Sequence, residues 1–135
     1  MNAPLFDHEK LQCYQQAIRF VALAEKVLGS VPKGISVRDQ LERASTSVPL
    51  NIAEGNGKYT DPDRCRFFDT ARGSALECAA CLDVLVAKKQ VSTEEALEAK
   101  ELLRSIVSML VGLIRSNSDT RLHEDHVVYR ILQRD

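Results

Sequence analysis

Apolar side chains recur at steps of three and four residues in four separate stretches of this chain, and this spacing limits the fold more than any other feature. The spacing places apolar residues on one face of an α-helix, whereas a half-buried strand needs strict alternation, which no stretch sustains. Four amphipathic helices bury their apolar faces by packing on one another. The pattern predicts an all-α protein, an antiparallel up-and-down four-helix bundle.

Glycine, proline and capping residues mark where the predicted helices begin and end. The helices are expected at about residues 7–28, 36–56, 62–89 and 93–116. A loop with two glycines and a proline covers 29–34, Pro62 suits a first helical turn, and Ser92 with Glu95 forms a capping box. The segment 117–135 begins polar and then regains apolar residues, so we expect a tail or short helix that lies either across the end of the bundle or in contact with another subunit.

The expected core face of each helix follows from its apolar stripe. In the first helix the stripe consists of Leu11, Tyr14, Ile18, Val21 and Leu28, and in the second of Val37, Leu41, Ala44, Val48 and Ile52. In the third it consists of Phe67, Ala71, Ser74, Cys78, Leu82 and Leu85, and in the fourth of Ala96, Ala99, Leu103, Ile106, Val107, Leu110, Leu113 and Ile114. These stripes predict one continuous core.

Pro49 falls inside the second predicted helix. Proline has no N–H to donate, and its ring clashes with the carbonyl group of Ser45, so we expect a kink or a brief break at residues 46–49. The hydroxyl groups of Ser45, Thr46 and Ser47 are placed to satisfy the carbonyl groups that the proline leaves free.

Charge and hydropathy exclude several classes of protein. Eighteen Lys plus Arg residues balance nineteen Asp plus Glu residues, and the formal net charge of −1 gives no chain-wide positive field to hold nucleic acid. The sequence shows neither a signal peptide nor the roughly 18 consecutive apolar residues of a membrane span. We therefore expect a cytoplasmic protein without a membrane partner.

Signatures of catalysis and of cofactor binding do not occur in the sequence. It contains no phosphate-binding glycine loop, no G-x-S-x-G elbow, no H-E-x-x-H and, on the main helices, no Glu-x-x-His of a di-iron site. Its four cysteines are Cys13, Cys65, Cys78 and Cys81. Buried reduced thiols are the favoured interpretation, with a zinc site as the alternative. We expect no enzyme activity and no cofactor.

A metal site is also conceivable in the last segment, where His123 and His126 share a helical face. A solvated polar turn is the favoured interpretation, because such spacings are common. We therefore expect no resident metal.

Polar residues are densest around the end of the second predicted helix and the start of the third. They are Arg43, Asn51, Glu54, Lys58, Arg64, Arg66, Arg72 and Glu77. If the two helices pack antiparallel, Glu54 approaches Arg64 or Arg66. Arg43 then lies nearer Glu77. The favoured interpretation is an ion-pair network that closes the helices or a subunit boundary, and the alternative is a binding site for phosphates or a partner protein.

The segments LERASTSVPLNIAEGNGK at 41–58 and FFDTARGSALE at 67–77 resemble the four-helix-bundle family of bacterial 23S rRNA intervening-sequence (S23-like) proteins. These are small proteins first noticed as reading frames inside insertions in large-subunit ribosomal RNA genes. The resemblance extends over about residues 11–116. It implies a bundle that assembles into a ring, a homopentamer, and a family of unknown function.

The family's motif positions are occupied here by Arg43, Asn51, Glu54, Gly55, Arg72, Gly73 and Ser74. The resemblance implies no catalytic role for any of them, and Lys58 matches the basic residue that is typical after Gly57. The chain departs from the family in having no Trp, which often stands in the first helix. It is also similar to the accessory variability protein of diversity-generating retroelements, a relative that binds a reverse transcriptase and nucleic acid.

Together these observations favour a non-enzymatic, self-assembling interaction or scaffold protein. On this hypothesis, the polar motif residues and the segment 117–135 form the contacts between the subunits of a homo-oligomer. The alternative is a nucleic-acid accessory factor, in which cationic side chains meet the phosphates of RNA or single-stranded DNA on an oligomeric ring. Those side chains are Arg43, Lys58, Arg64, Arg66 and Arg72.

Overall fold

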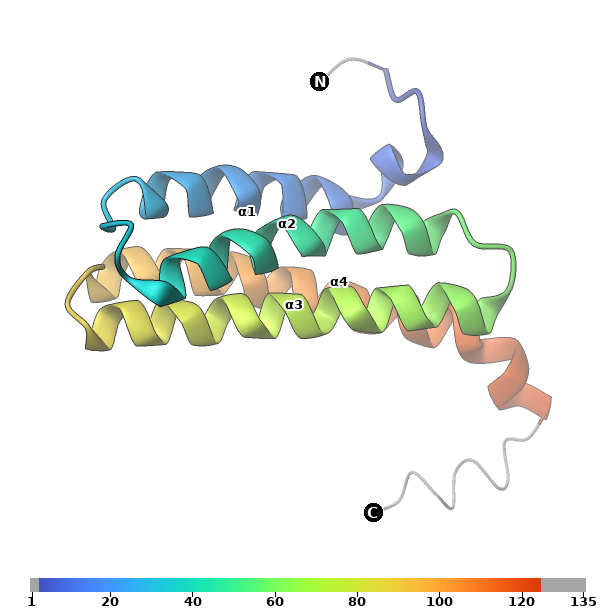
Figure 1. The fold of residues 1–135 in the computed structure, drawn as a ribbon. Helices are drawn as coiled ribbons and strands as arrows, with labels where there is room; N and C mark the ends of the chain where they lie inside the picture. Colours follow the sequence, from blue (N-terminus) through green and yellow to red (C-terminus); the bar gives the residue numbers. More distant parts are fainter. Residues whose placement is uncertain (1–2, 125–135) are drawn as a thin grey trace.

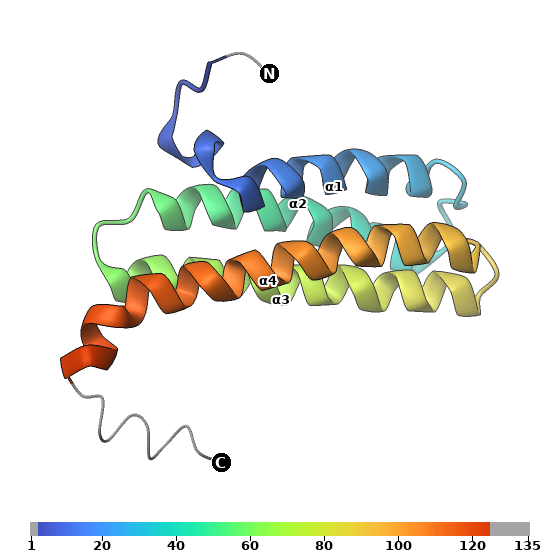
Figure 2. The same cartoon turned by 180° about the vertical axis from the view of Figure 1, so that it is seen from behind.

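A computed structural model describes residues 3–124, and within them the side chains as far as residue 118. A 3-10 turn at Asp7–Lys10 precedes four α-helices: α1 at Gln12–Leu28, α2 at Ser36–Asn56, α3 at Asp61–Ala87 and α4 at Thr93–Glu124. Helices α1 and α2, α2 and α3, α3 and α4, and α4 and α1 pack together and close the bundle (Figures 1 and 2). The predicted all-α antiparallel four-helix bundle is confirmed.

The core lies between the four helices and is mostly aliphatic. Its largest completely buried side chains are Phe20, Phe68, Leu41, Ile52, Leu82, Leu85, Leu103, Ile106 and Leu110. All five residues of the stripe predicted for α2 are buried, and the α3 and α4 stripes are buried along most of their length. None of the described helices is long and apolar enough to cross a lipid bilayer.

The core face of α1 differs from the prediction. Its buried residues are Cys13, Ala17, Phe20, Ala24, Val27 and Leu28, so of the predicted stripe only Leu28 is buried, and Ile18 is 45% exposed. The buried face alternates small and large side chains, which lets Phe20 pack between its small neighbours. The predicted stripe contained only large side chains and therefore missed the small residues of this face.

Helix α2 continues through Pro49, so of the predicted kink or brief break only the break is wrong. Its ribbon changes direction gently along its length (Figure 1). The proline ring is buried. The hydroxyl groups of Ser45 and Thr46 both donate to the carbonyl oxygen of Glu42, at 2.9 and 3.0 Å, one turn before the predicted site. Packing on both sides of the proline keeps the helix continuous although one backbone hydrogen bond is lost.

The ends of two helices also differ from the prediction. Helix α1 begins at Gln12, because residues 7–10 form a separate 3-10 turn. Helix α4 extends eight residues beyond the predicted end at Ser116. There the side chains of Asn117 and Ser118 donate to carbonyl oxygens one turn earlier, at 2.7 Å each, so these polar residues do not end the helix. The remainder of the predicted tail, 125–135, lies outside the described residues.

Candidate interaction surfaces

A short chain of hydrogen bonds joins α2 to α3 at two of the motif positions. The Asn51 side-chain amide donates to the carbonyl oxygen and to the hydroxyl oxygen of Ser47, at 2.9 Å in both cases. The Ser47 and Ser74 hydroxyl groups share a hydrogen bond of 2.8 Å. These three side chains are half-buried. The Ser47–Ser74 hydrogen bond therefore joins two helices of the same protomer, and Asn51 holds the Ser47 hydroxyl group in place.

Gly55 lies where α2 packs tightly against side chains of α3. A methyl group at this position would lie 2.9 Å from Cδ1 and Cε1 of Phe68 and 3.0 Å from Cβ of Phe67. Such distances are too short for carbon atoms, whose favourable separation is about 3.5–4.0 Å. Gly73, by contrast, is exposed, and a methyl group there would meet nothing within 4 Å. The packing of the helices requires the first glycine and does not require the second.

Arg64 closes the end of α2 from the first turn of α3. Its guanidinium group donates to the carbonyl oxygens of Asn56, at 2.7 Å, and Lys58, at 3.2 Å. It also donates to Oδ1 of Asn117 on α4, at 2.7 Å, and lies 5.8 Å from the centre of the Phe68 ring. Carbonyl groups at the end of a helix have no partner within the helix, so Arg64 supplies one.

The same polar network reaches the N-terminal segment. The amide group of Asn56 donates to Oδ2 of Asp7 at 3.0 Å. This hydrogen bond, reinforced by the positive charge of Lys10, lowers the pKa of the Asp7 carboxyl group. Through Asn56, Arg64 and Asn117, the network ties the N-terminal turn to the ends of α2, α3 and α4.

The cross-helix ion-pair network that the sequence suggested is wrong. In this region the ion pairs that the structure describes are local: Glu54 with Lys58 at 3.8 Å, Arg66 with Asp63 at 3.4 Å, and Arg72 with Asp69 at 2.9 Å. Each pair joins residues three or four positions apart, because a carboxylate one turn away is closer than any on the neighbouring helix. These pairs are largely exposed and contribute little to stability.

Arg43 and Glu77 both lie close enough to Cys81 to act on its thiol. Burial raises the pKa of that thiol, the negative charge of Glu77 raises it further, and the positive charge of Arg43 lowers it. The predicted proximity of Arg43 to Glu77 stays a prediction. Both side chains are nonetheless exposed, and their charges face solvent beside the α2–α3 contact.

Two cations lie over one aromatic ring at this end of the bundle. Nζ of Lys58 is 5.0 Å and Cζ of Arg66 is 4.9 Å from the centre of the Phe67 ring. Tyr59, in the connection between α2 and α3, is completely exposed. Cations next to aromatic faces can stabilise the local structure or take part in recognition.

The cysteines are built into the packing. Burial raises the pKa of Cys13 to about 11 and that of Cys78 to about 12. Cys65 is half-buried and donates to the carbonyl oxygen of Ile114 at 3.5 Å. Groups of three or more His, Cys, Asp and Glu side chains that could hold a metal ion do not occur within the described part of the chain. The predicted pair His123 and His126 lies outside the described side chains.

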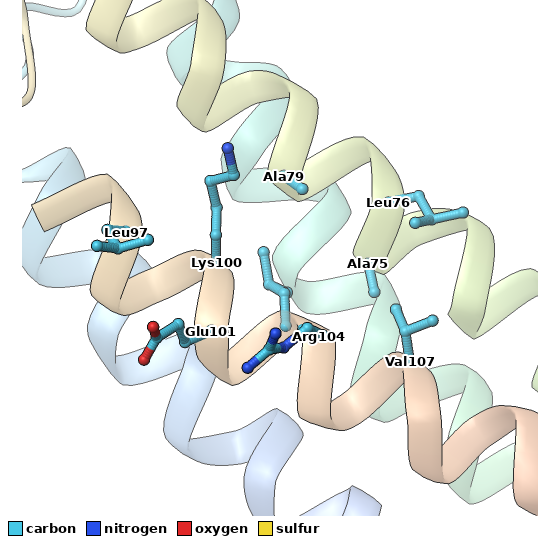
Figure 3. Close-up of a pocket in the computed structure, with 9 residues that line it drawn as sticks. Ala75, Leu76, Ala79, Leu97, Lys100, Glu101, Arg104 and Val107 are labelled. Carbon is cyan, nitrogen blue, oxygen red and sulfur yellow. The ribbon is translucent and has the colours of Figure 1, made fainter. Parts of the chain in front are cut away.

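An apolar groove runs between α3 and α4, with a volume of about 380 Å³ (Figure 3). It is lined by Ala75, Leu76 and Ala79 of α3 and by Leu97, Lys100, Glu101, Leu103, Arg104 and Val107 of α4. Leu76 is 49% exposed and Leu97 is 57% exposed. The apolar pattern of the sequence does not reveal this groove, because both leucines lie beside the core stripes and the small alanines leave the space between the helices open.

A second, more polar hollow follows the outer face of α2. It is lined by Asp39, Glu42, Arg43, Thr46, Ser47, Leu50 and Asn51. Leu50 is one of the lining residues, and its side chain is 60% exposed. Of the predicted site residues, only Arg43 and Asn51 line this hollow, and none lines the α3–α4 groove.

The fold and these surfaces define a small helical-bundle protein in which Gly55 and Ser74 of the motif hold α2 against α3. Residues 9–112 match the family described as 23S rRNA-intervening sequence protein, and the chain belongs to this family. The predicted resemblance is thus confirmed, while the similarity to the retroelement accessory protein stays a prediction.

A solved relative shows the same fold. It is a protein of unknown function from the S23 ribosomal protein family of Bacteroides thetaiotaomicron, similar with a TM-score of 0.71 and 20% sequence identity. The match covers 76% of this chain and 98% of that chain. At this identity the likeness concerns the fold alone. No curated protein matches the chain.

We predict that the two motif glycines respond oppositely to substitution. Gly55→Ala should lower the free energy of unfolding by about 1–3 kcal/mol, because the methyl group overlaps the Phe68 ring. Gly73→Ala should raise it by up to about 1 kcal/mol, because alanine favours an exposed helix. Urea denaturation of both variants measures the difference, and equal effects would contradict the close approach at Gly55.

We also predict that Arg64 and Arg66 differ in their contribution to stability. Arg64→Met should lower the free energy of unfolding by about 1–3 kcal/mol, since it leaves the carbonyl groups of Asn56 and Lys58 without their donor. Arg66→Met should lower the free energy of unfolding by less than about 1 kcal/mol, because the ion pair of Arg66 is exposed. Thermal unfolding at equal protein concentration compares them. Equal losses of stability in the two variants would show that the hydrogen bonds of Arg64 do not stabilise the end of α2.

Proposed function

We propose that this protein is a non-enzymatic interaction module that assembles with copies of itself through the groove between α3 and α4. The observation that carries the proposal is that Leu76 and Leu97 are about half exposed and line one apolar hollow. Single exposed leucines are common on protein surfaces, but a contiguous apolar hollow with a polar rim is typical of an interaction site.

The motif residues have a different part in this proposal from the one that the sequence suggested. Asn51, Arg64 and Ser74 make hydrogen bonds within the protomer, and Gly55 is covered by Phe68. These contacts leave the four residues little capacity to bind a partner. Their contribution to assembly is indirect, because they fix α3 against α2 and so position one wall of the groove. The homopentameric ring implied by the family resemblance is the assembly that we propose.

Charged substitutions in the groove should dissociate the assembly. The double variant Leu76→Glu/Leu97→Glu should weaken self-association at least about tenfold, equivalent to about 1.4 kcal/mol, because carboxylates would have to be buried without partners. Sedimentation velocity at micromolar concentration should give a multiple of the 15.1 kDa chain for the wild type, fivefold for a pentamer, and a smaller particle for the variant.

The matched control for this experiment is Ile18→Glu, on α1, where the side chain is 45% exposed and lies outside the groove. It should leave the particle mass unchanged. Leu50→Glu tests the α2 hollow in the same way. If the wild type is a monomer, or if only Leu50→Glu dissociates the particle, the groove is not the assembly surface.

Nucleic-acid binding is the second candidate function, and one observation favours it. Lys58 and Arg66 flank the Phe67 ring next to the exposed Tyr59, and aromatic rings combined with cations suit single-stranded nucleic acid. However, Lys58 and Arg66 each have a carboxylate within 4 Å. These carboxylates would repel phosphates, so we rank this function second.

We expect little salt-dependent binding of RNA or single-stranded DNA. A protein that neutralises several phosphates loses affinity steeply between about 50 and about 200 mM salt. Fluorescence polarisation with labelled oligonucleotides at both concentrations measures this dependence. Tight binding that weakens steeply with salt, and that is lost in Lys58→Gln and in Tyr59→Ala, would favour the accessory-factor function.

A further inference from the structure

We infer that residues 125–135 of one copy bind in the α3–α4 groove of a second copy. This inference rests on the proposed self-assembly and names the segment that fills the groove. The α4 side of the groove runs from Leu97 to Val107, about 15 Å along the helix. Eleven residues in helical form measure about 16 Å, so the segment matches the length of the groove.

The sequence of this segment suits a helix that packs in an apolar groove. Its apolar residues Val127, Val128, Ile131 and Leu132 follow helical spacing, so one face would be aliphatic. Amphipathic helices bind apolar grooves through side chains spaced in this way. On the other side, the alanines at 75 and 79 leave room for branched aliphatic side chains between Leu76 and Leu97.

In helical form, the segment cannot reach the groove of the same copy. Seventeen residues of α4 separate Val107 from Glu124, which is about 25 Å along the helix, and the last turns of α4 lead away from the bundle (Figures 1 and 2). A helix of about 16 Å that turned back at Glu124 would end before the groove begins. A fully extended segment of at most about 40 Å would reach the groove, but it would lose the helical spacing that places its apolar side chains on one face. A helical segment therefore fits only the groove of a second copy.

Charge neither opposes nor drives this contact. The rim of the groove carries both signs: Lys100 pairs with Asp83 at 2.6 Å, and Glu101 and Arg104 are exposed. The segment carries two arginines and two aspartates. Because neither surface has an excess of one sign, the contact should depend on apolar burial and vary little with salt.

The contact is directional, since the segment of one copy meets a different surface on the next. Contacts of this kind close into a ring when the rotation between copies permits it. A ring of any size would therefore use one groove and one segment from each subunit.

The inference is tested with full-length chains. Ile131→Asp/Leu132→Asp should weaken self-association at least about tenfold, because charges would replace two of the apolar side chains in the groove. The control Arg130→Gln/Arg134→Gln changes the polar residues of the same segment and should keep the particle mass of the wild type. Sedimentation velocity compares the three proteins.

A peptide separates this inference from self-assembly in general. A fluorescein-labelled peptide of residues 122–135 should bind to the full-length Ile131→Asp/Leu132→Asp variant, whose groove is intact. Adding Leu97→Glu to that variant should weaken peptide binding at least about tenfold, and raising the salt from about 50 to about 500 mM should change it less than about twofold.

The outcomes are distinct. If Ile131→Asp/Leu132→Asp assembles like the wild type and the peptide does not bind, the inference is overturned while self-assembly stands. If the wild type is a monomer, the proposed function fails, and peptide binding alone then decides whether the groove takes the segment. Binding of a scrambled peptide with equal affinity would also overturn the inference.

Discussion

The close approach of α2 and α3 at Gly55 is the constraint on which much of this structure depends. Without a side chain at Gly55, the ring of Phe68 packs directly against the α2 backbone. The end of α2 is then near enough to α3 for Arg64 to bind its last carbonyl groups, and the Ser47–Ser74 hydrogen bond continues the contact along both helices. A larger residue at Gly55 would separate the helices and strain these contacts together.

This packing explains why a motif rich in charged residues need not be a binding site. Arginine is valuable at helix ends because its planar fork can donate to several carbonyl oxygens at once, and Arg64 does so while stacking over Phe68. Lys58, Arg66 and Arg72 pair with carboxylates one turn away. The surface with unfilled apolar space lies elsewhere, between α3 and α4, and it depends on the motif only because the motif fixes α3.

Membership of the 23S rRNA-intervening sequence protein family fits a fold whose packing residues are separate from its exposed groove residues. Two chains with 20% identity share the fold with a TM-score of 0.71, because a bundle tolerates many substitutions as long as the apolar pattern is kept. The exposed residues of the outer groove, Leu76 and Leu97, are less constrained, since they lie outside the core. Proteins with the same bundle can therefore differ in their outer surfaces.

The sequence by itself determined the four helices, most of their limits, the buried faces of α2, α3 and α4, and the family. Apolar spacing, glycine, proline and capping residues act within one or two turns, so they can be read locally. Only the tertiary structure decided the buried face of α1, the partners of Arg64 and Glu54, and the groove at Leu76 and Leu97. These depend on how close two separate helices come, and that distance is set by side chains far apart in the chain.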